Sequence, residues 1–324
     1  MNFPYSVTDP RAHRWVMVSG APRSGTTFVG TVLGLPKSVN TLYEPYNPNC
    51  GVAWNEQRYL YVDPDAPLDP EMARHLDDFF SYRFSLKTVF SARDSRLERI
   101  AKRIIGGGNQ IALLKGRLSP VADTSLIKDP IAVFLTEIFA RRHAVRTVLL
   151  TRHPLSFVGS LKRLGWRYKV EPLLAQPALA ARVVPDLGPD TVEEGDWIAA
   201  SAWIWTAIAR YVLEIEQTLG DHVLHITHEK VSEEPEPSFH RMFDFTGIRP
   251  NEKVWELVRN STEGKDMPET GKVHDFNRNS QAIFSKSIQA LTEEEQDKVL
   301  SICWDTAQRI YADPRGPGRV EERL

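Results

Sequence analysis

The chain has few cysteines and lacks any long hydrophobic run. Only two of its 324 residues are cysteine, Cys50 and Cys303, and they lie far apart in the sequence. This argues against a disulfide framework, and no clustered His and Cys spacing indicates a zinc site. No segment has the apolar length of a signal-peptide core or a membrane span. We therefore expect a chain without a membrane span, working in the reducing cytoplasm.

An excess of charge of one sign is also missing. The 40 Lys and Arg residues nearly balance the 42 Asp and Glu residues, which leaves a formal net charge of −2. Without a basic bias, we expect no nucleic-acid partner. Hydrophobic residues make up 42% of the chain, which is enough to bury one large core or a core with a cap. We expect a single domain over residues 1–324.

The most informative stretch is an apolar strand that runs into a glycine-bracketed loop and then a helix. Gly20 and Gly25 keep the G-x-x-x-x-G spacing of a phosphate-binding loop, and Thr27 stands where Ser or Thr would contact magnesium. The expected lysine is replaced by Thr26, so the loop is not built for ATP and a metal. Backbone N–H groups at a helix N-terminus and the guanidinium of Arg23 suit a sulfated or phosphorylated nucleotide instead.

The loop from Pro22 to Thr27 resembles the one with which sulfotransferases hold the 5′-phosphosulfate of 3′-phosphoadenosine 5′-phosphosulfate (PAPS). The resemblance implies a donor site without a metal, with Arg23 acting both in binding and in catalysis. The loop residues that it assigns to the donor are Arg23, Ser24, Gly25, Thr26 and Thr27. Four further matches follow in the family's order, between Glu44 and Lys286.

The first match contains a candidate general base. Leu42-Tyr43-Glu44-Pro45 resembles the Tyr-Glu-Pro of carbohydrate 6-O-sulfotransferases and the loop-proximal Glu of protein-tyrosine sulfotransferases. In those families the glutamate is the base. Independently, residues 38–43 read as a strand, and the residue after a strand faces the ligand crevice of an open α/β sheet. A surface glutamate in a Pro-rich turn is the alternative for Glu44 considered alone.

The second match ends an apolar run with a cation. Leu126-Ile127-Lys128-Asp129-Pro130 resembles the Lys-Asp-Pro of tyrosine sulfotransferases, in which the lysine assists the departing group. An ammonium beside the bridging oxygen can offset the charge that develops there. Lys128 is thus predicted to be catalytic, and a solvated lysine before a helix is the alternative.

The third match, Val148 to Ser160, reads as a strand, an arginine and a helix that Pro154 opens. It resembles the family's 3′-phosphate motif, which pairs an Arg with a Ser eight positions later, here Arg152 and Ser160. Charge-assisted bonds from a guanidinium suit a phosphate dianion. Ser156 lies one helical turn before Ser160 on the same face, so either hydroxyl can make the contact, and we predict Ser160.

The last matches are less complete. His228 stands where the family usually has a tyrosine, and we assign it to the donor site as an aromatic ring beside the adenine. Ser285-Lys286 resembles the Ser-Lys before a Trp in tyrosine sulfotransferases, although Ser287 replaces that Trp here. The resemblance implies that Ser285 is catalytic and that Lys286 binds the donor.

Alternating strand and helix patterns predict an α/β fold with a P-loop-type parallel sheet flanked by helices. We expect strands at 15–19, 39–43, 111–114 or 126–128, 145–151 and 223–227. Helices are expected at 26–35, 132–143, 155–164, 197–219 and 292–311. Two stretches interrupt the alternation, 47–108 and 165–195, and we expect them to be helical insertions that form an acceptor-binding cap or gate.

These patterns predict an enzyme that moves the sulfuryl group from PAPS to an acceptor hydroxyl by in-line displacement. The sequence resembles stand-alone bacterial members of the family. The expected acceptor is a carbohydrate or glycolipid, and a tyrosine or a small-molecule natural product is the alternative. A divergent P-loop kinase or NTPase is a further alternative, but it would need a lysine at position 26 and an acidic magnesium ligand at a strand end. The strand ending at Thr151 presents Arg152 instead.

Overall fold

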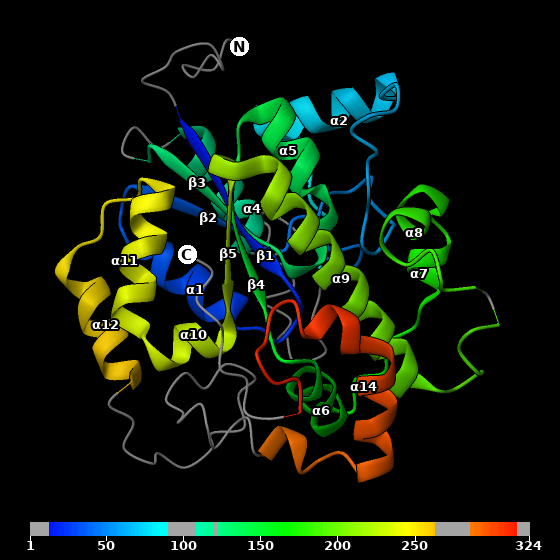
Figure 1. Ribbon diagram of the computed structural model, residues 1–324. Coiled ribbons are helices and arrows are strands. Elements are labelled where there is room, and N and C mark those ends of the chain that lie inside the picture. Colours follow the sequence, from blue (N-terminus) through cyan, green and yellow to red (C-terminus); the bar gives the residue numbers. More distant parts are fainter. Residues whose placement is uncertain (1–12, 90–107, 119–121, 189, 263–285, 316–324) are drawn as a thin grey trace, which may run out of the picture.

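The fold is centred on a parallel sheet with the strand order β2-β3-β1-β4-β5 (Figure 1). The computed structural model describes residues 13–89, 108–118, 122–188, 190–262 and 286–315. The strands are β1 (Arg14–Gly20), β2 (Val39–Tyr43), β3 (Thr124–Lys128), β4 (Arg146–Thr151) and β5 (Val223–Thr227). The predicted α/β fold with a P-loop-type parallel sheet is confirmed.

The register brings the carboxyl ends of the strands to one edge of the sheet. Lys128, the last residue of β3, pairs with Val18 of β1 and with Tyr43 of β2. On the other side, Gly20 pairs with Leu150 of β4. Neighbouring strands lie about 4.8 Å apart, so five strand ends extend over roughly 19 Å. Residues that follow these strands therefore share one elongated edge.

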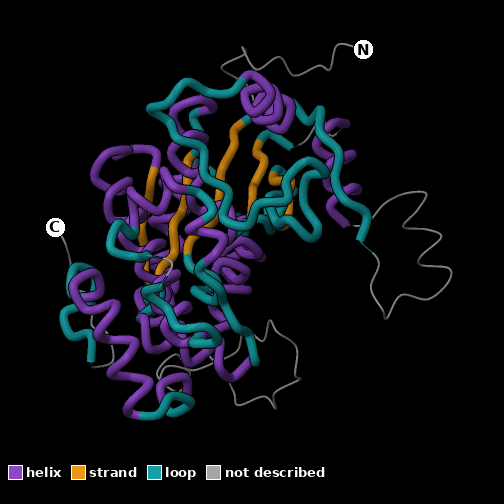
Figure 2. Tube along the Cα trace, turned by 90° about the vertical axis from the view of Figure 1, so that its right-hand side faces the viewer, coloured by secondary structure: helices purple, strands orange, loops and turns teal. Residues whose placement is uncertain are grey.

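Helices cover both faces of the sheet (Figures 1 and 2). One face carries α1 (Thr26–Leu33), α10 (His228–Glu233), α11 (Pro235–Thr246) and α12 (Glu252–Thr262). The other carries the 3-10 helix η1 (Pro130–Leu135), α5 (Thr136–His143) and α9 (Trp197–Leu219), with α6 (Pro154–Leu164) and α14 (Glu293–Ala307) packed on α9. Val16 and Val18 pack on the first face and Met17 on the second, as the alternation of a strand requires.

Helix α9 lies in the middle of its layer. The side chain of Asp196 caps it by accepting from the N–H of Ala199 (3.0 Å). Trp203 and Trp205 are buried. The expectation that no segment has the apolar length of a membrane span was wrong, because Trp197–His222 meets that criterion by length and composition. However, 89% of its apolar window is buried inside the protein. It is packed as a core helix.

The structure decides between the two candidates for the third strand and corrects the start of one expected helix. The third strand is Thr124–Lys128, while residues 111–114 lie in α4 (Gly108–Leu118), because a short apolar run fits a helix as well as a strand. The helix expected at 132–143 starts earlier, as η1. Asp129 caps η1 by accepting from the N–H of Ile131 (2.9 Å), and Pro130 fits its first turn. The other four expected helices also form. The helix at 197–219 has the expected ends, and the ends of the other three are shifted.

Both excursions from the alternation contain helices that the sequence analysis did not place. The first, residues 47–108, carries α2 (Pro70–Phe80) and runs into α4. The second, residues 165–195, carries α7 (Glu171–Leu174) and α8 (Pro177–Val183). The segments α7 and α8 are too short to show a clear helical period. By contrast, α2 has a start signal in the sequence, Asp69 followed by Pro70, that could have predicted it.

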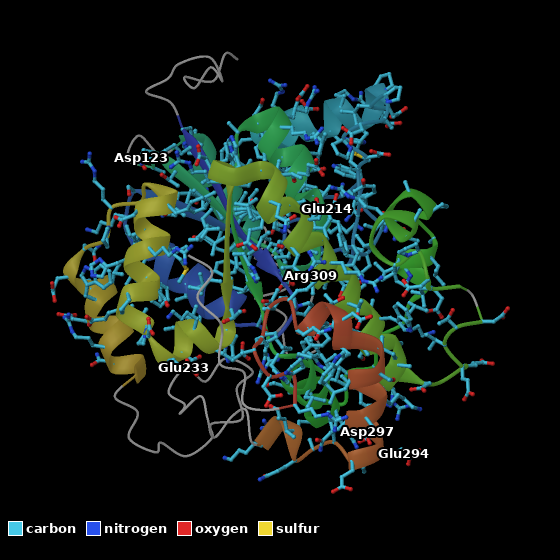
Figure 3. The ribbon with its side chains drawn as sticks, viewed as in Figure 1. Asp123, Glu214, Glu233, Glu294, Asp297 and Arg309 are labelled. Atoms are coloured by element: carbon cyan, nitrogen blue, oxygen red, sulfur yellow. The ribbon has the colours of Figure 1, made fainter. Side chains whose placement is uncertain are left out.

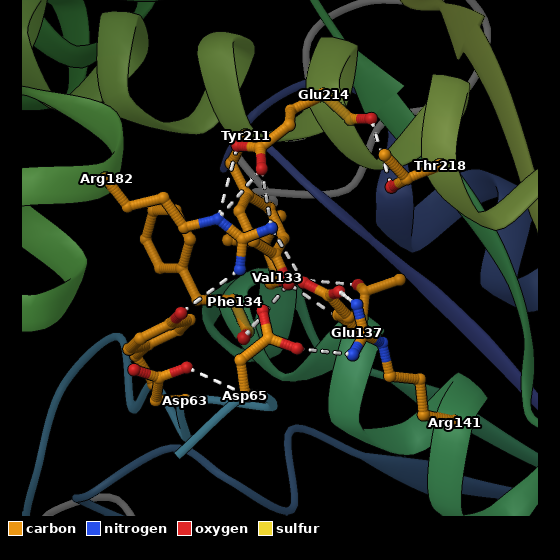
Figure 4. Close-up of polar contacts among 12 residues, drawn as sticks. Asp63, Asp65, Val133, Phe134, Glu137, Arg141, Arg182, Tyr211, Glu214 and Thr218 are labelled. Atoms are coloured by element: carbon orange, nitrogen blue, oxygen red, sulfur yellow. Dashed lines mark hydrogen bonds and ion pairs between the residues drawn. The ribbon is translucent and has the colours of Figure 1, made fainter.

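An ionic cluster fastens the second excursion to the core (Figure 4). Arg182 of α8 contacts Glu137 of α5 (Nη2 to Oε2, 2.7 Å) and Glu214 of α9 (Nη2 to Oε1, 2.8 Å). Its Nη1 also donates to the hydroxyl of Tyr61 in the first excursion (3.1 Å). Glu137 is only 2% exposed and pairs with Arg141 as well. One guanidinium thus joins four parts of the chain around a buried carboxylate.

Candidate active site

Every strand of the sheet is followed or ended by residues that the sequence analysis assigned to the site. Glu44 follows β2, Lys128 ends β3, the loop 20–25 follows β1, Arg152 follows β4 and His228 follows β5. The strand order therefore brings together motifs that are spread over most of the chain. This edge is where open α/β sheets bind their ligands.

The loop after β1 depends on glycine and on contacts with β4. Gly20 has φ 126°, and a Cβ there would lie 2.0 Å from the carbonyl oxygen of Leu150. Only glycine tolerates this backbone. The N–H of Ala21 donates to the same carbonyl (2.9 Å), and the hydroxyl of Ser24 donates to the carbonyls of Ala21 and Leu150. The N–H of Ser24 also donates to the carbonyl of Ala21 (3.2 Å), so Ser24 shapes the loop with both its side chain and its backbone. Its assignment to the donor stays a prediction.

The N-terminus of α1 faces the edge with open backbone donors. Gly25 is the N-cap residue and has no side chain that could cap the helix. The N–H groups of Thr26, Thr27 and Phe28 have no acceptor within the helix, as in the first turn of any α-helix. Together with the positive end of the helix dipole, they form a place for an anion.

Arg152 is a buried cation. It is 4% exposed, and its three donor nitrogens reach Ser156 Oγ (2.8 Å), the carbonyl of Arg23 (2.9 Å) and Ser287 Oγ (3.4 Å). Within the described ranges, no carboxylate forms an ion pair with it. Burial lowers the pKa of Arg152 to about 10. Because a buried cation is costly without an anion, this guanidinium is suited to bind one.

The two candidate serines of α6 differ in their contacts. Ser156 accepts from Nε of Arg152, whereas Ser160, one turn later, is buried at 5% exposure. The preference for Ser160 over Ser156 stays a prediction. Gly159 lies between them, and a Cβ there would lie 1.9 Å from the carbonyl oxygen of Ser287. Helix α6 can therefore approach the segment of Ser287 only because this position is glycine.

Ser287 is a site residue that sequence reasoning missed. The sequence analysis treated it only as the replacement of an expected Trp, yet its hydroxyl contacts Arg152 (3.4 Å). Lys286 next to it is exposed. Ser285 lies outside the described residues, so its predicted catalytic role stays a prediction.

His228 lies against the loop. Its Nδ1 would be 3.0 Å from a Cβ at Gly25. Burial, reinforced by Arg152 and Arg23, lowers the pKa of His228 to about 3. The imidazole is therefore neutral at physiological pH and offers a ring without charge to a ligand at this edge.

Glu44 and Lys128 form an ion pair at the other end of the edge. Lys128 Nζ lies 2.9 Å from Glu44 Oε1, and Asn47 Nδ2 donates to Oε2 (2.8 Å). Burial alone would raise the pKa of Glu44, but Lys128, Asn47 and Arg58 together lower it. Glu44 is thus ionised at neutral pH and 32% exposed, so it can accept a proton from a ligand. Asn47 and Arg58 were not singled out from the sequence.

Close packing and a turn hold this pair in place. Lys128 is 5% exposed, and its Cγ would lie 2.6 Å from a Cβ at Gly30, so its stem runs along α1. The N–H of Glu44, which has φ 48°, donates to the carbonyl of Lys128 (2.7 Å). The buried carboxylate of Asp129 accepts from the N–H of Tyr46 (2.7 Å) and so fixes the chain just after Glu44.

Arg23 connects the loop with the second excursion. It has φ 68°, its carbonyl accepts from Arg152, and its guanidinium lies over the ring of Trp166, 5.8 Å from the centroid. Trp166 follows α6 and is 41% exposed. Sequence reasoning did not connect Trp166 with the loop, because the contact spans 143 positions of the chain.

The site carries positive charge although the chain is slightly acidic. Lys128 and Arg58 act on Glu44, while Arg23 and Arg152 act on His228. Of the charged side chains labelled in Figure 3, Asp123, Glu233, Glu294 and Asp297 lie near the outline of the molecule, whereas Glu214 and Arg309 lie over its middle. In the part of the chain that the structure describes, no group of three or more His, Cys, Asp or Glu side chains could hold a metal ion.

Comparisons with known proteins were made by family, by sequence and by structure. No family model and no curated protein matches the chain. Among solved structures, it is similar to the sulfotransferase domain from the curacin biosynthetic pathway, with a TM-score of 0.45, 14% identity, and coverage of 91% of this chain and 97% of that one.

Two further solved structures have comparable scores. One is a sulfotransferase from Mycobacterium avium, with a TM-score of 0.45, 13% identity, and coverage of 98% of this chain and 80% of the other. The second is retinol dehydratase in complex with androsterone and the inactive cofactor PAP, with a TM-score of 0.43, 15% identity, and coverage of 94% and 82%.

Proposed function

We propose that this chain is a PAPS-dependent sulfotransferase that acts on an acceptor hydroxyl. The observation that carries the proposal is the placement of the Glu44–Lys128 pair and the buried Arg152 on one sheet edge, on either side of the loop 20–25. PAPS has two separate anionic groups, at the 5′ and 3′ positions. The site offers two cationic side chains for them, Arg23 in the loop and Arg152 after β4.

The residues present fit this donor. The backbone N–H groups of Gly25, Thr26 and Thr27, together with Arg23, would hold the 5′-phosphosulfate at the N-terminus of α1. Arg152 would hold the 3′-phosphate, because it is buried and, within the described ranges, no carboxylate is in ion-pair contact with it, although the charge of Glu229 acts on it. Further donor contacts are proposed for the Ser160 hydroxyl, the ring of His228 and the exposed ammonium of Lys286.

In the proposed reaction, Glu44 takes the proton of the acceptor hydroxyl. The acceptor oxygen forms a bond to sulfur while the bond from sulfur to the bridging oxygen breaks. The electron pair of that bond leaves with 3′-phosphoadenosine 5′-phosphate. Lys128 stabilises the negative charge on the bridging oxygen, and Ser285 is proposed to assist. Such a transfer gains most from alignment and charge stabilisation, so no covalent enzyme intermediate is needed.

A divergent P-loop kinase or NTPase is the weaker alternative. Thr26 replaces the lysine that would contact the β- and γ-phosphates, and the end of β4 presents Arg152 where an acidic magnesium ligand would stand. The proposed acceptor is a carbohydrate or glycolipid, with a tyrosine or a small-molecule natural product as the alternative. The two cysteines are free, which is compatible with the cytoplasmic location that we propose.

The test is thermal denaturation with 3′-phosphoadenosine 5′-phosphate, 5′-AMP or Mg-ATP at equal concentration. A ligand at a hundred times its Kd adds about 2.7 kcal/mol of stability. We expect a raised Tm only with the 3′-phosphorylated nucleotide. Arg152→Gln should lose this shift, whereas Arg146→Gln, at the opposite end of the same strand, should keep it. A larger shift with Mg-ATP would overturn the proposal in favour of an NTPase.

A further inference from the structure

We propose that Arg58 binds an anionic group of the acceptor, so that the preferred acceptors carry a carboxylate, sulfate or phosphate besides the hydroxyl that is sulfated. The inference rests on the proposed function, because it names the acceptor class of the same site.

Arg58 lies between two aromatic rings that come from different excursions. Its Cζ is 5.2 Å from the ring centroid of Tyr59 and 5.1 Å from that of Tyr168. Tyr59 belongs to the first excursion, and Tyr168 to the second. Within the described ranges, no Asp or Glu forms an ion pair with Arg58. Burial would lower the pKa of Arg58, but its interactions and side-chain hydrogen bonds with Tyr59 and Tyr168 raise it. The guanidinium is thus partly buried and held by two tyrosines, and it keeps its charge without a carboxylate partner.

The charge of Arg58 acts on the acceptor side of the site. Asn55 Nδ2 donates to the carbonyls of Tyr46 (2.6 Å) and Gln57 (3.1 Å), so the chain just before Arg58 is tied to the chain just after Glu44. In keeping with this placement, the charge of Arg58 helps to lower the pKa of Glu44. The charges that act on His228, at the donor end, are Arg152 and Arg23. Of the two cations that act on Glu44, Lys128 is proposed to serve the bridging oxygen of the donor. Arg58 is then the cation beside Glu44 for which the donor's two anionic groups leave no evident use.

Hydrogen bonds between the two excursions fix the backbone on both sides of Arg58. Gln57 Nε2 donates to the carbonyl of Pro172 (3.1 Å). Gln176 Nε2 donates to the carbonyl of Tyr59 (2.9 Å), and its Oε1 accepts from the N–H of Tyr61 (2.9 Å). These contacts make Arg58 part of a built surface rather than a freely moving surface side chain. Because Arg58 is already held in place, it loses little conformational entropy when a ligand binds.

The chemistry favours an anion. A neutral acceptor that covered Arg58 would remove water from a cation and replace it with nothing, which is costly. An anionic acceptor would replace the water with charge-assisted hydrogen bonds. A site built for a polar contact discriminates strongly against analogues that lack it. We expect about a ten- to hundredfold preference in kcat/KM for a carboxylate over its carboxamide.

The experiment uses matched pairs of acceptors, each a hydroxylated carboxylate and its carboxamide. Suitable pairs are a uronic acid glycoside, an N-acyl tyrosine and a hydroxy fatty acid, each with its amide. Sulfuryl transfer from PAPS is measured with the wild-type chain, Arg58→Gln, Arg58→Lys and the control Arg74→Gln, an exposed arginine of the same excursion. In Arg58→Gln, we expect KM to rise for the carboxylate but not for the carboxamide, so that the preference for the carboxylate is lost. In Arg58→Lys, part of this preference should remain.

Other outcomes would overturn the inference. Equal use of acid and amide by the wild-type chain would exclude an anion-binding role. An equal loss on both acceptors in Arg58→Gln, with a shifted pH profile, would mean that Arg58 acts only on Glu44. Transfer to no carboxylate also counts against the inference if 3′-phosphoadenosine 5′-phosphate still raises Tm, because donor use then stands. If that nucleotide does not raise Tm, the proposed function itself fails, and the inference with it.

Discussion

At the scale of single residues, the ion pair between Glu44 and Lys128 decides how the site can work. A glutamate in a partly buried place would ordinarily hold its proton more tightly. Here the contact with Lys128 Nζ (2.9 Å) and the amide of Asn47 keep it ionised. The same lysine is proposed to assist the leaving group, so one cation both readies the base and stabilises the charge that the reaction releases.

Lys128→Met should raise the pKa of Glu44 and shift the acid limb of the pH profile. In the wild-type chain the pKa of Glu44 is lowered from its ordinary value, so kcat/KM is lost only when the pH falls into the acid range where this carboxylate takes up a proton. Without Lys128, only Asn47 and Arg58 oppose the effect of burial, so the limb should move to higher pH. The profile of kcat/KM between pH 4 and 8 measures the shift. An unmoved limb would contradict the assignment of Glu44 as the base.

Two further variants test the role of Glu44 and provide a control for this measurement. Glu44→Gln should lose about 10²- to 10⁴-fold in rate, as expected for removal of a general base, and should still bind 3′-phosphoadenosine 5′-phosphate. Lys37→Met, an exposed lysine after α1, should leave both rate and profile unchanged.

At the scale of elements, the site depends on how closely α6 and α1 approach their neighbours. Gly30 lets the stem of Lys128 run along α1, and Gly159 lets α6 touch the backbone of Ser287. Both glycines lie inside helices, where alanine would otherwise be favoured by about 0.5–1 kcal/mol. Their presence marks places where close packing outweighs helix propensity.

Gly159→Ala should weaken donor binding although it improves helix propensity. Its Cβ would lie 1.9 Å from the Ser287 carbonyl, so α6 or that segment must shift and move Ser287 away from Arg152. Calorimetry with 3′-phosphoadenosine 5′-phosphate should show an affinity loss of about tenfold. Gly188→Ala is the matched control, since its Cβ would make only an ordinary contact with Thr191, at 3.4 Å. Unchanged affinity in Gly159→Ala would show that α6 does not position the site.

At the scale of the whole molecule, the two excursions are joined to each other and to the core by polar contacts. Gln57 and Gln176 link them beside Arg58, and Arg182 links both to α5 and α9. The proposed acceptor side is therefore assembled from segments more than a hundred positions apart. Its geometry depends on these few contacts as much as on the sheet.

Arg182→Met should destabilise the fold by about 1–3 kcal/mol, because it leaves the buried carboxylate of Glu137 with Arg141 as its remaining cation. Urea unfolding at neutral pH measures the loss from the midpoint at an unchanged m-value. Arg142→Met is the comparison, since it breaks a surface pair with Asp77 and should cost at most about 1 kcal/mol. If the two variants lose the same free energy of unfolding, the cluster of Figure 4 contributes no more to stability than a surface ion pair.

The sequence by itself determined the sheet and the order of its site residues. A glycine-bracketed loop after an apolar strand, and charged residues directly after other strands, are local patterns, so Glu44, Lys128 and Arg152 could be found without coordinates. Local pattern also predicted that residues 47–108 and 165–195 leave the alternation. It did not decide between residues 111–114 and 126–128, because a short apolar run fits either element.

Only the tertiary structure decided which residues complete the site. Arg58, Trp166 and Ser287 have no local signature, and each matters through a partner far away in the chain: Tyr168, Arg23 and Arg152. The charge state of a group such as His228 likewise depends on burial and on cations from other strands. Spacing along the chain records what each segment forms locally, whereas burial, charge and contact at the sheet edge arise when distant segments pack together.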